Sequence, residues 1–158
     1  MDAIQLLKSD HQKVKELLTE LADTTTRAVK KRSDLLEQIR VNLKAHTTIE
    51  EEIFYPAFKK AGEKDEARMY YEAMEEHRAA GDLVLPDLLN TATDSENFSG
   101  RAKVLKELVE HHVKEEEDDM FKAARKLLSR DELKELGQRM EQRKAELVKE
   151  LRRSKPTA

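Results

Sequence analysis

One pattern of histidines and glutamates occurs twice in the chain, and an offset of 66 residues relates the two copies. The offset superposes His11 on His77, His46 on His112, Glu50 on Glu116 and Glu51 on Glu117. Four of the five histidines are thus placed by one rule. We therefore expect a fold with two similar halves, in which the repeated residues meet at one place.

The composition predicts that the elements of this fold are helices. Of 158 residues, 38% are hydrophobic and 40% are charged, with only four Gly and three Pro. This balance is typical of amphipathic helices with charged outer faces, and it disfavours a sheet protein with many turns. The length suits one domain. We expect an all-α domain.

Charge and cysteine content exclude several functions. The formal charge of −3 gives no basic excess for nucleic acid or an anionic membrane. No apolar run approaches the ~20 residues that span a bilayer, and the N-terminus lacks the features of a signal peptide, so we expect a cytoplasmic protein. Because the chain has no cysteine, imidazole and carboxylate are its available metal-binding groups.

Apolar residues at helical spacing, together with breaking residues, predict five helices. The first helix is expected from Asp2 to about Thr24, and the second contains Leu35 and ends through the effect of Pro56 and Gly62. The third runs from Asp65 to Leu89 with a kink near Pro86, and a loop follows from Asn90 to Gly100. The fourth helix contains the apolar residues from Leu105 to Leu127, and the fifth runs from Arg130 to Arg153. Ser129 and Glu132 form a capping box for the last helix. We expect this helix to lie along the bundle or to reach a partner subunit, with a frayed tail at 154–158.

Four amphipathic helices with short connections favour a bundle, whose core is a recurrent place for metal sites. A histidine and a glutamate four residues apart share one helix face. The predicted ligands are His11, His46, Glu50, His77, His112 and Glu116. Four imidazoles in terminal positions and two bridging carboxylates suit two metal ions, with iron favoured over manganese or zinc.

The alternative is a bundle without metal, because a single histidine on an apolar face is more often structural than a ligand. Two buried carboxylates, however, would each cost several kcal/mol without a cation. His111 lies about 100° from His112 around the helix, so we expect it at the rim. Apart from Glu116, the acidic run from Glu115 to Asp119 is interpreted as a solvated face.

The motifs resemble one known family. Four motifs carry the resemblance: the lone His11; His46-x-x-x-Glu50 followed by Ile53-Phe54-Tyr55-Pro56; His77 in EEHR; and His112-x-x-x-Glu116 followed by Met120-Phe121. They are similar to the motifs of the haemerythrin-like HHE cation-binding family over about residues 1–128. The stretch DELKELGQRMEQRKAEL resembles the C-terminal extension of bacterial members, so residues 129–158 are expected to belong to the same domain. The resemblance implies an up-and-down four-helix bundle and an oxo- or hydroxo-bridged di-iron centre.

One departure from the family affects the expected function. Oxygen-carrying haemerythrins have two histidines four apart on the third helix, whereas the positions around His77 are Ala73 and Gly81. Reversible oxygen carriage is therefore disfavoured, and the vacant position would be open to solvent or filled by a substitute such as Tyr70. Glu116 also replaces the aspartate of the oxygen carriers, as in the HHE subgroup.

The expected partner is a small diatomic ligand or peroxide, met under oxidative or nitrosative stress, with neither nucleic acid nor membrane involved. As an enzyme the chain would decompose peroxide in a catalase-like reaction. The alternatives without turnover are a metal-dependent sensor or interaction module and a protein for iron storage or delivery. We expect a monomer or a weak homo-oligomer.

Overall fold

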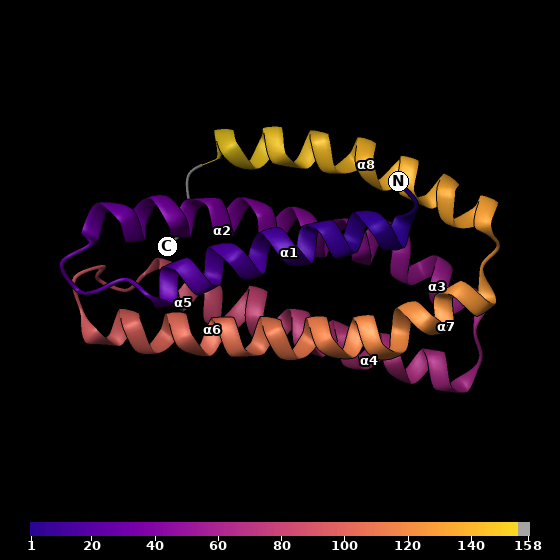
Figure 1. The fold of residues 1–158 in the computed structure, drawn as a ribbon, viewed down its shortest axis with the longest axis horizontal. Helices are drawn as coiled ribbons and strands as arrows, with labels where there is room; N and C mark the ends of the chain where they lie inside the picture. The colour runs from indigo at the N-terminus through magenta and orange to yellow at the C-terminus, as the bar shows by residue number, and fades with distance from the viewer. Residues whose placement is uncertain (155–158) are drawn as a thin grey trace.

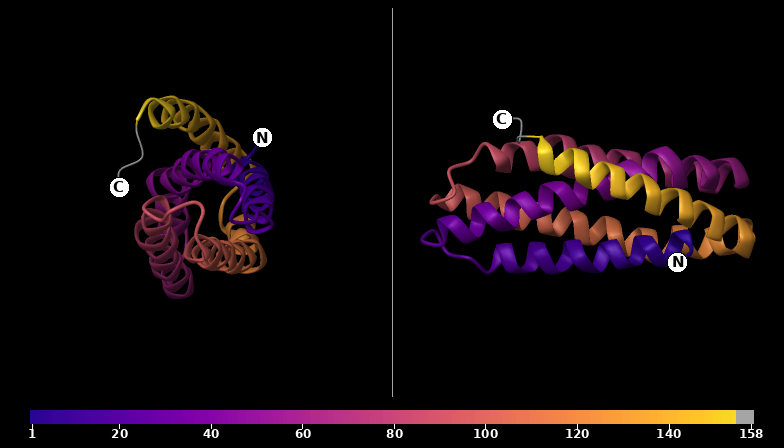
Figure 2. Two further views of the ribbon diagram at one scale, coloured as in Figure 1. Left: turned by 90° about the vertical axis from the view of Figure 1, so that its left-hand side faces the viewer. Right: turned by 90° about the horizontal axis from the view of Figure 1, so that it is seen from above.

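The computed structural model describes residues 1–154 and has an all-α fold, a four-helix bundle with an additional helix outside it (Figure 1). In the view along the bundle axis, its helices lie around a common centre and the last helix lies outside them (Figure 2). In chain order the four rods of the bundle are α1 (Ala3–Ala22); α2 (Val29–Ile49), η1 (Glu50–Phe54) and α3 (Tyr55–Ala61); α4 (Lys64–His77), η2 (Arg78–Val84) and α5 (Leu85–Leu89); and α6 (Glu96–Glu115), η3 (Glu116–Met120) and α7 (Phe121–Leu127). The outer helix is α8 (Arg130–Arg153).

The segments η1, η2 and η3 are π-helical turns, and the 66-residue offset relates two of them. The segment η1 begins at Glu50 and η3 at Glu116, so both start at a repeated glutamate. In each, the N–H that follows the segment bonds to a carbonyl five residues earlier, as for Tyr55 to Glu50 and Phe121 to Glu116. Such turns widen a helix and are frequent at functional sites.

The prediction that Pro56 helps to end the second helix is wrong. The rod continues through Pro56 to Ala61, because the π-helical turn lets Pro56 lie in the first turn of α3, where a missing N–H is tolerated. Pro86 is placed likewise in α5. The predicted loop also ends earlier than expected, since α6 begins at Glu96. There Ser95 caps the helix and Phe98 is buried.

Two apolar clusters fill the bundle, one at each end, and the polar side chains of the repeat lie between them. One cluster contains Leu18, Ile39 and Phe98, and the other contains Phe54, Phe58 and Met140 of α8. The core therefore has an ionisable layer across its middle. No helix within residues 1–154 is both long and apolar enough to cross a bilayer.

Helix α8 lies along α1 and α2, on the side away from α4 and α6 (Figure 1). Its Gly137 permits this approach, because a Cβ there would lie 2.5 Å from the carbonyl oxygen of Met1. At the other end of α8, the buried Arg40 donates to the carbonyls of Leu151 and Ser154 at 2.7 and 3.1 Å. Ser154 is thus held by hydrogen bonds, although we expected a frayed tail from it onward; residues 155–158 lie outside the described residues.

Candidate metal centre

The bundle brings the six repeated residues together at its centre. His11 comes from α1, His46 from α2 beside Glu50 of η1, His77 from the end of α4, and His112 from α6 beside Glu116 of η3. All six are buried, with Glu50 at 0% exposure and Glu116 at 2%. A layer of this kind needs compensation, since an ionised carboxylate is costly to bury without a cation.

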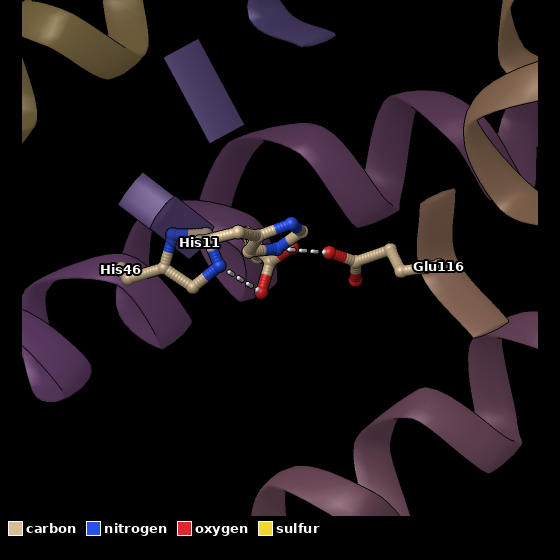
Figure 3. A group of neighbouring side chains, drawn as sticks. His11, His46 and Glu116 are labelled. Carbon is tan, nitrogen blue, oxygen red and sulfur yellow. Dashed lines mark ion pairs between the residues drawn. The ribbon is translucent and has the colours of Figure 1, made fainter. Parts of the chain in front are cut away.

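The candidate ligand atoms form two groups that share both glutamates. His11 and His46 belong to one group and His77 and His112 to the other, and within each group these atoms lie within 4.8 Å of one another. His11 Nε2 is 2.9 Å from Glu116 Oε1, and the two side chains turn toward each other beside His46 (Figure 3). His77 Nε2 is 3.1 Å from Glu50 Oε1. Shared carboxylates between two imidazole pairs are the arrangement that bridged cations require.

Each histidine is oriented by a carboxylate on its outer side. The four Nδ1 contacts are His11 with Glu117 at 2.7 Å, His46 with Asp10 at 2.9 Å, His77 with Glu51 at 2.8 Å, and His112 with Glu76 at 2.6 Å. An ionised carboxylate can only accept, so Nδ1 donates and Nε2 points to the centre. Oriented imidazoles of this kind are typical of metal-binding histidines. The contacts also obey the offset, since Asp10 pairs with Glu76 and Glu51 with Glu117.

In the metal-free protein, the cluster has strongly shifted pKa values. Burial alone would lower the pKa of His46, but the carboxylates of Glu50 and Asp10 raise it to about 10. Burial is likewise outweighed for His112, whose pKa lies well above the ordinary value because of Glu116 and Glu76. Burial would raise the pKa of Glu116, yet His112 and His11 hold it well below its usual range. Protons on the imidazoles thus supply the positive charge that cations would otherwise provide.

Several buried atoms at the centre have no hydrogen-bond partner with acceptable geometry. They are His11 Nε2, His46 Nε2, both carboxylate oxygens of Glu50, and Glu116 Oε1. Some of them lie near 3 Å from an oppositely charged group, but without the alignment of a hydrogen bond. Buried polar atoms are nearly always partnered in native proteins. The donor set of four imidazoles and two carboxylates therefore fits a pair of metal ions.

Tyr55 is a residue of the centre that the sequence analysis missed. Its hydroxyl donates to Glu116 Oε2 and lies 3.1 Å from His77 Nε2 and 3.4 Å from His112 Nε2. Burial and the charges of Glu116 and Glu50 raise the pKa of Tyr55 well above its ordinary value. The offset relates Tyr55 to Phe121, whose ring stacks on His11 with centroids 5.7 Å apart. The two halves of the centre therefore differ by one hydroxyl.

Small cavities adjoin the two positions that lack the expected histidine. Ala73 lines a cavity of about 140 Å³ that reaches His112 and Glu116. Gly81 lines one of about 20 Å³ beside His77. Tyr70, which we considered as a substitute ligand, instead packs its ring edge-on against Tyr55. Space for small molecules thus exists next to the centre: the larger cavity adjoins His112 and Glu116, and the smaller one touches all four histidines.

The structure separates the two neighbouring histidines of α6. His112 lies in the buried cluster, whereas the His111 side chain is 63% exposed. The interpretation of the acidic run as a solvated face is wrong at Glu117, which orients His11. The offset contained the signal for this role, because it pairs Glu117 with Glu51 and each of them faces a lone histidine of the other half.

Comparison with known proteins agrees with this geometry. The family model described as Hemerythrin HHE cation binding domain matches residues 2–124 of this chain. The chain belongs to this family. A crystal structure of a hemerythrin HHE cation-binding-domain protein from Mycobacterium kansasii superposes with a TM-score of 0.82 at 27% identity, covering 95% of this chain and 89% of that one. The predicted family and the haemerythrin-like fold are thereby confirmed, and the buried His and Glu cluster is consistent with the HHE ligand pattern.

Curated relatives of this haemerythrin-like chain include two kinds of protein. A protein named DNA nickase from Nostoc sp. (strain PCC 7120) is 28% identical over 96% of this chain, which spans only 41% of that protein. An uncharacterised protein of Mycobacterium tuberculosis (strain H37Rv) is 29% identical, with 89% of this chain and 83% of that protein covered.

Proposed function

We propose that this chain is a non-haem di-iron protein that binds or reacts with oxygen, peroxide or nitric oxide under oxidative or nitrosative stress. The observation that carries the proposal is the buried set of four carboxylate-oriented imidazoles around two shared glutamates. His11 and His46 would hold one ion, His77 and His112 the other, and Glu50 and Glu116 would bridge them. Nitrogen and oxygen ligands in this mixture favour iron over manganese or zinc.

A pair of iron ions bound here would supply a centre able to bind small ligands and exchange electrons with them. The protein groups have separate tasks around it. Asp10, Glu51, Glu76 and Glu117 fix the tautomer and direction of the four imidazoles. Phe121 and the apolar clusters on either side limit water, so that ligands arrive from a restricted direction.

The proposed partner, a diatomic ligand or peroxide, is supported by the form of the cavities. The cavity beside Ala73 adjoins His112 and Glu116, and the cavity beside Gly81 adjoins the four histidines. Their volumes of about 140 and 20 Å³ suit molecules of a few atoms. The hydroxyl of Tyr55, which contacts Glu116, His77 and His112, adds a hydrogen-bond donor to this part of the centre. This combination favours ligand chemistry over a purely structural metal site.

The test is the metal content and visible spectrum of protein purified without chelator, before and after peroxide. We expect about two irons per chain, one for each group of ligands, and a spectrum that changes with peroxide. Oxygen release by the iron-loaded protein then separates a catalase-like enzyme from a carrier. Protein that holds no metal, and takes up none from ferrous iron without air, would contradict the proposal.

A metal-dependent sensor is a second candidate, favoured by one specific contact. Lys144 of α8 forms an ion pair with Asp10, which orients His46, so the outer helix is linked to the centre. Loading of the centre would then change how firmly α8 is held. Removal of residues 130–158 tests this: unchanged metal binding and an unchanged oligomeric state would argue against a sensor. Iron storage or delivery without turnover would appear as uptake and release with no peroxide chemistry.

The nickase activity of the Nostoc relative is not proposed for this chain. The chain spans 41% of that protein, and its charge of −3 offers no basic excess for the phosphate backbone.

A further inference from the structure

The 66-residue offset relates two opposite faces of the bundle that differ in chemistry. On one face, Leu6, Ala45, Ile49 and Ile53 are buried in the cluster that includes Leu136, Met140 and Leu147 of α8. The offset places on the other face Glu72, His111, Glu115 and Asp119. Helix α8 packs against α1, α2 and η1 and so covers the apolar face. The second face remains exposed. It carries three acids and a histidine at the positions that correspond, by the offset, to the four apolar residues of the first face.

A cavity leads inward from the exposed face. Its lining includes the acids Glu72, Glu76 and Glu115 at the surface and Glu116 at the centre. Ala73 lines the same cavity, at the position where the apolar face has the buried Leu7. The small side chain therefore leaves a volume of about 140 Å³ where a leucine would fill space. The cavity reaches a carboxylate that is 2% exposed and has one oxygen without a hydrogen-bond partner.

The side chains at the outer end of the cavity are arranged like a set of metal ligands. His111 Nε2 lies 3.1 Å from Glu115 Oε1 and 3.5 Å from Glu76 Oε2, and the three groups each offer a ligand atom within 4.8 Å of the others. The other oxygen of Glu76 lies 2.6 Å from His112 Nδ1. One carboxylate thus faces both the outer group and a histidine of the centre.

Within the described residues, Glu76 and Glu115 face the imidazoles of His111 and His112 but no lysine or arginine. Within residues 1–154, no Lys or Arg nitrogen lies within 4.0 Å of Glu72, Glu76 or Glu115. The neighbouring carboxylate of Glu115 raises the pKa of Glu72. On the opposite face, by contrast, Lys144 neutralises Asp10, which the offset relates to Glu76. The exposed face thus combines acids that no lysine or arginine neutralises with a route to the centre.

We infer that Glu76, His111 and Glu115 bind a divalent first-row transition-metal ion at the mouth of the cavity, from which the ion passes Ala73 to the His77 and His112 half of the centre. The inference deepens the proposed function and rests on it for the destination of the ion. An ordinary solvated helix face would show the i, i+4 pair of His111 and Glu115, but not the cavity to Glu116. One imidazole and two carboxylates suit Fe²⁺, Mn²⁺ or Co²⁺, and their charge attracts a cation.

The experiment measures uptake of Co²⁺ by the metal-free protein, followed by its visible bands in a stopped-flow instrument and by calorimetric titration. We expect the double variant His111→Ala, Glu115→Gln to reach the same two ions per chain about tenfold more slowly. Asp118→Asn is the matched control, because it removes one carboxylate of the same run that pairs with Lys114 instead. Glu76 is left intact, since it orients His112.

A second variant separates binding at the mouth from passage inward. Ala73→Val narrows the cavity, so we expect slower filling of the centre while a third, weaker Co²⁺ ion still binds outside; the double variant should lose this third ion. Uptake by the double variant at the wild-type rate, or equal slowing by Asp118→Asn, would overturn the inference while leaving the proposed function intact. Wild-type protein that takes up neither Co²⁺ nor ferrous iron at the centre would overturn both.

Discussion

Lys144 of α8 forms an ion pair with one oxygen of Asp10, while the other oxygen of Asp10 lies 2.9 Å from His46 Nδ1. Burial opposes ionisation of Asp10, but His46 and Lys144 lower its pKa below the usual range. A helix outside the bundle therefore contributes to the orientation of a candidate ligand. The offset-related Glu76 has no such partner among the described residues, so the two halves of the centre differ in charge as well as in Tyr55.

Replacing Lys144 by Met should weaken both the docking of α8 and the hold on His46. We expect a loss of about 1 kcal/mol in the unfolding free energy, because Asp10 is buried while Lys144 is partly solvated. Chelator should also remove metal faster from this variant. Thermal melting and metal-release kinetics measure the two effects. Lys149→Met, at an exposed position of the same helix, is the control, and equal behaviour of both variants would exclude this role for Lys144.

The buried layer of candidate ligands could be predicted from the sequence, because it depends on helix periodicity and on the repeat. His46 and Glu50 are four residues apart on one helix, so their shared face follows from regular geometry. The capping box at Ser129 likewise predicted the start of α8 correctly, since it is a local interaction. Such features need no knowledge of how distant segments pack.

Tyr55 could not be found in the same way. On a regular α-helix, a residue five positions after Glu50 points about 140° away from it. The π-helical turn η1 bonds Tyr55 to the carbonyl of Glu50 and brings its side chain back over the centre. The sequence also left open whether α8 lies on the bundle or reaches another subunit, because its position depends on long-range contacts such as those of Gly137 and Arg40.

Replacing Tyr55 by Phe should change the chemistry of the centre more than the fold. Phe121 already occupies the offset-related position, so a phenyl ring fits this environment. Loss of the hydroxyl near His77 and His112 should alter the visible spectrum of the iron-loaded protein while about two ions remain bound. Tyr70→Phe is the matched control, because Tyr70 contacts Tyr55 through its ring. If Tyr55→Phe leaves the spectrum unchanged, the hydroxyl has no part in the chemistry of the centre.

Substitution of a glutamate that belongs to both groups of candidate ligands should remove more metal ions than substitution of a histidine that belongs to one group. Glu50 belongs to both groups, so Glu50→Gln should reduce the metal content to below one ion per chain and lower the melting temperature of metal-loaded protein. His46 belongs to one group, and His46→Gln should retain about one ion. Elemental analysis measures both. Glu52→Gln, an exposed neighbour paired with Arg143, should keep two ions. A bundle without metal would instead be stabilised by Glu50→Gln.

The stability of the metal-free protein should decrease as the pH rises above neutrality. His46 has a pKa of about 10 in the folded state and near 6.5 when unfolded, because Glu50 and Asp10 outweigh the effect of burial. Its contribution is complete below pH 6.5, where both states are protonated. Between pH 6.5 and 10 only the folded state holds this proton, so its share of the unfolding free energy falls by about 1.4 kcal/mol per pH unit. Melting in chelator across this range measures the slope, which His46→Gln should flatten; identical slopes would contradict the raised pKa.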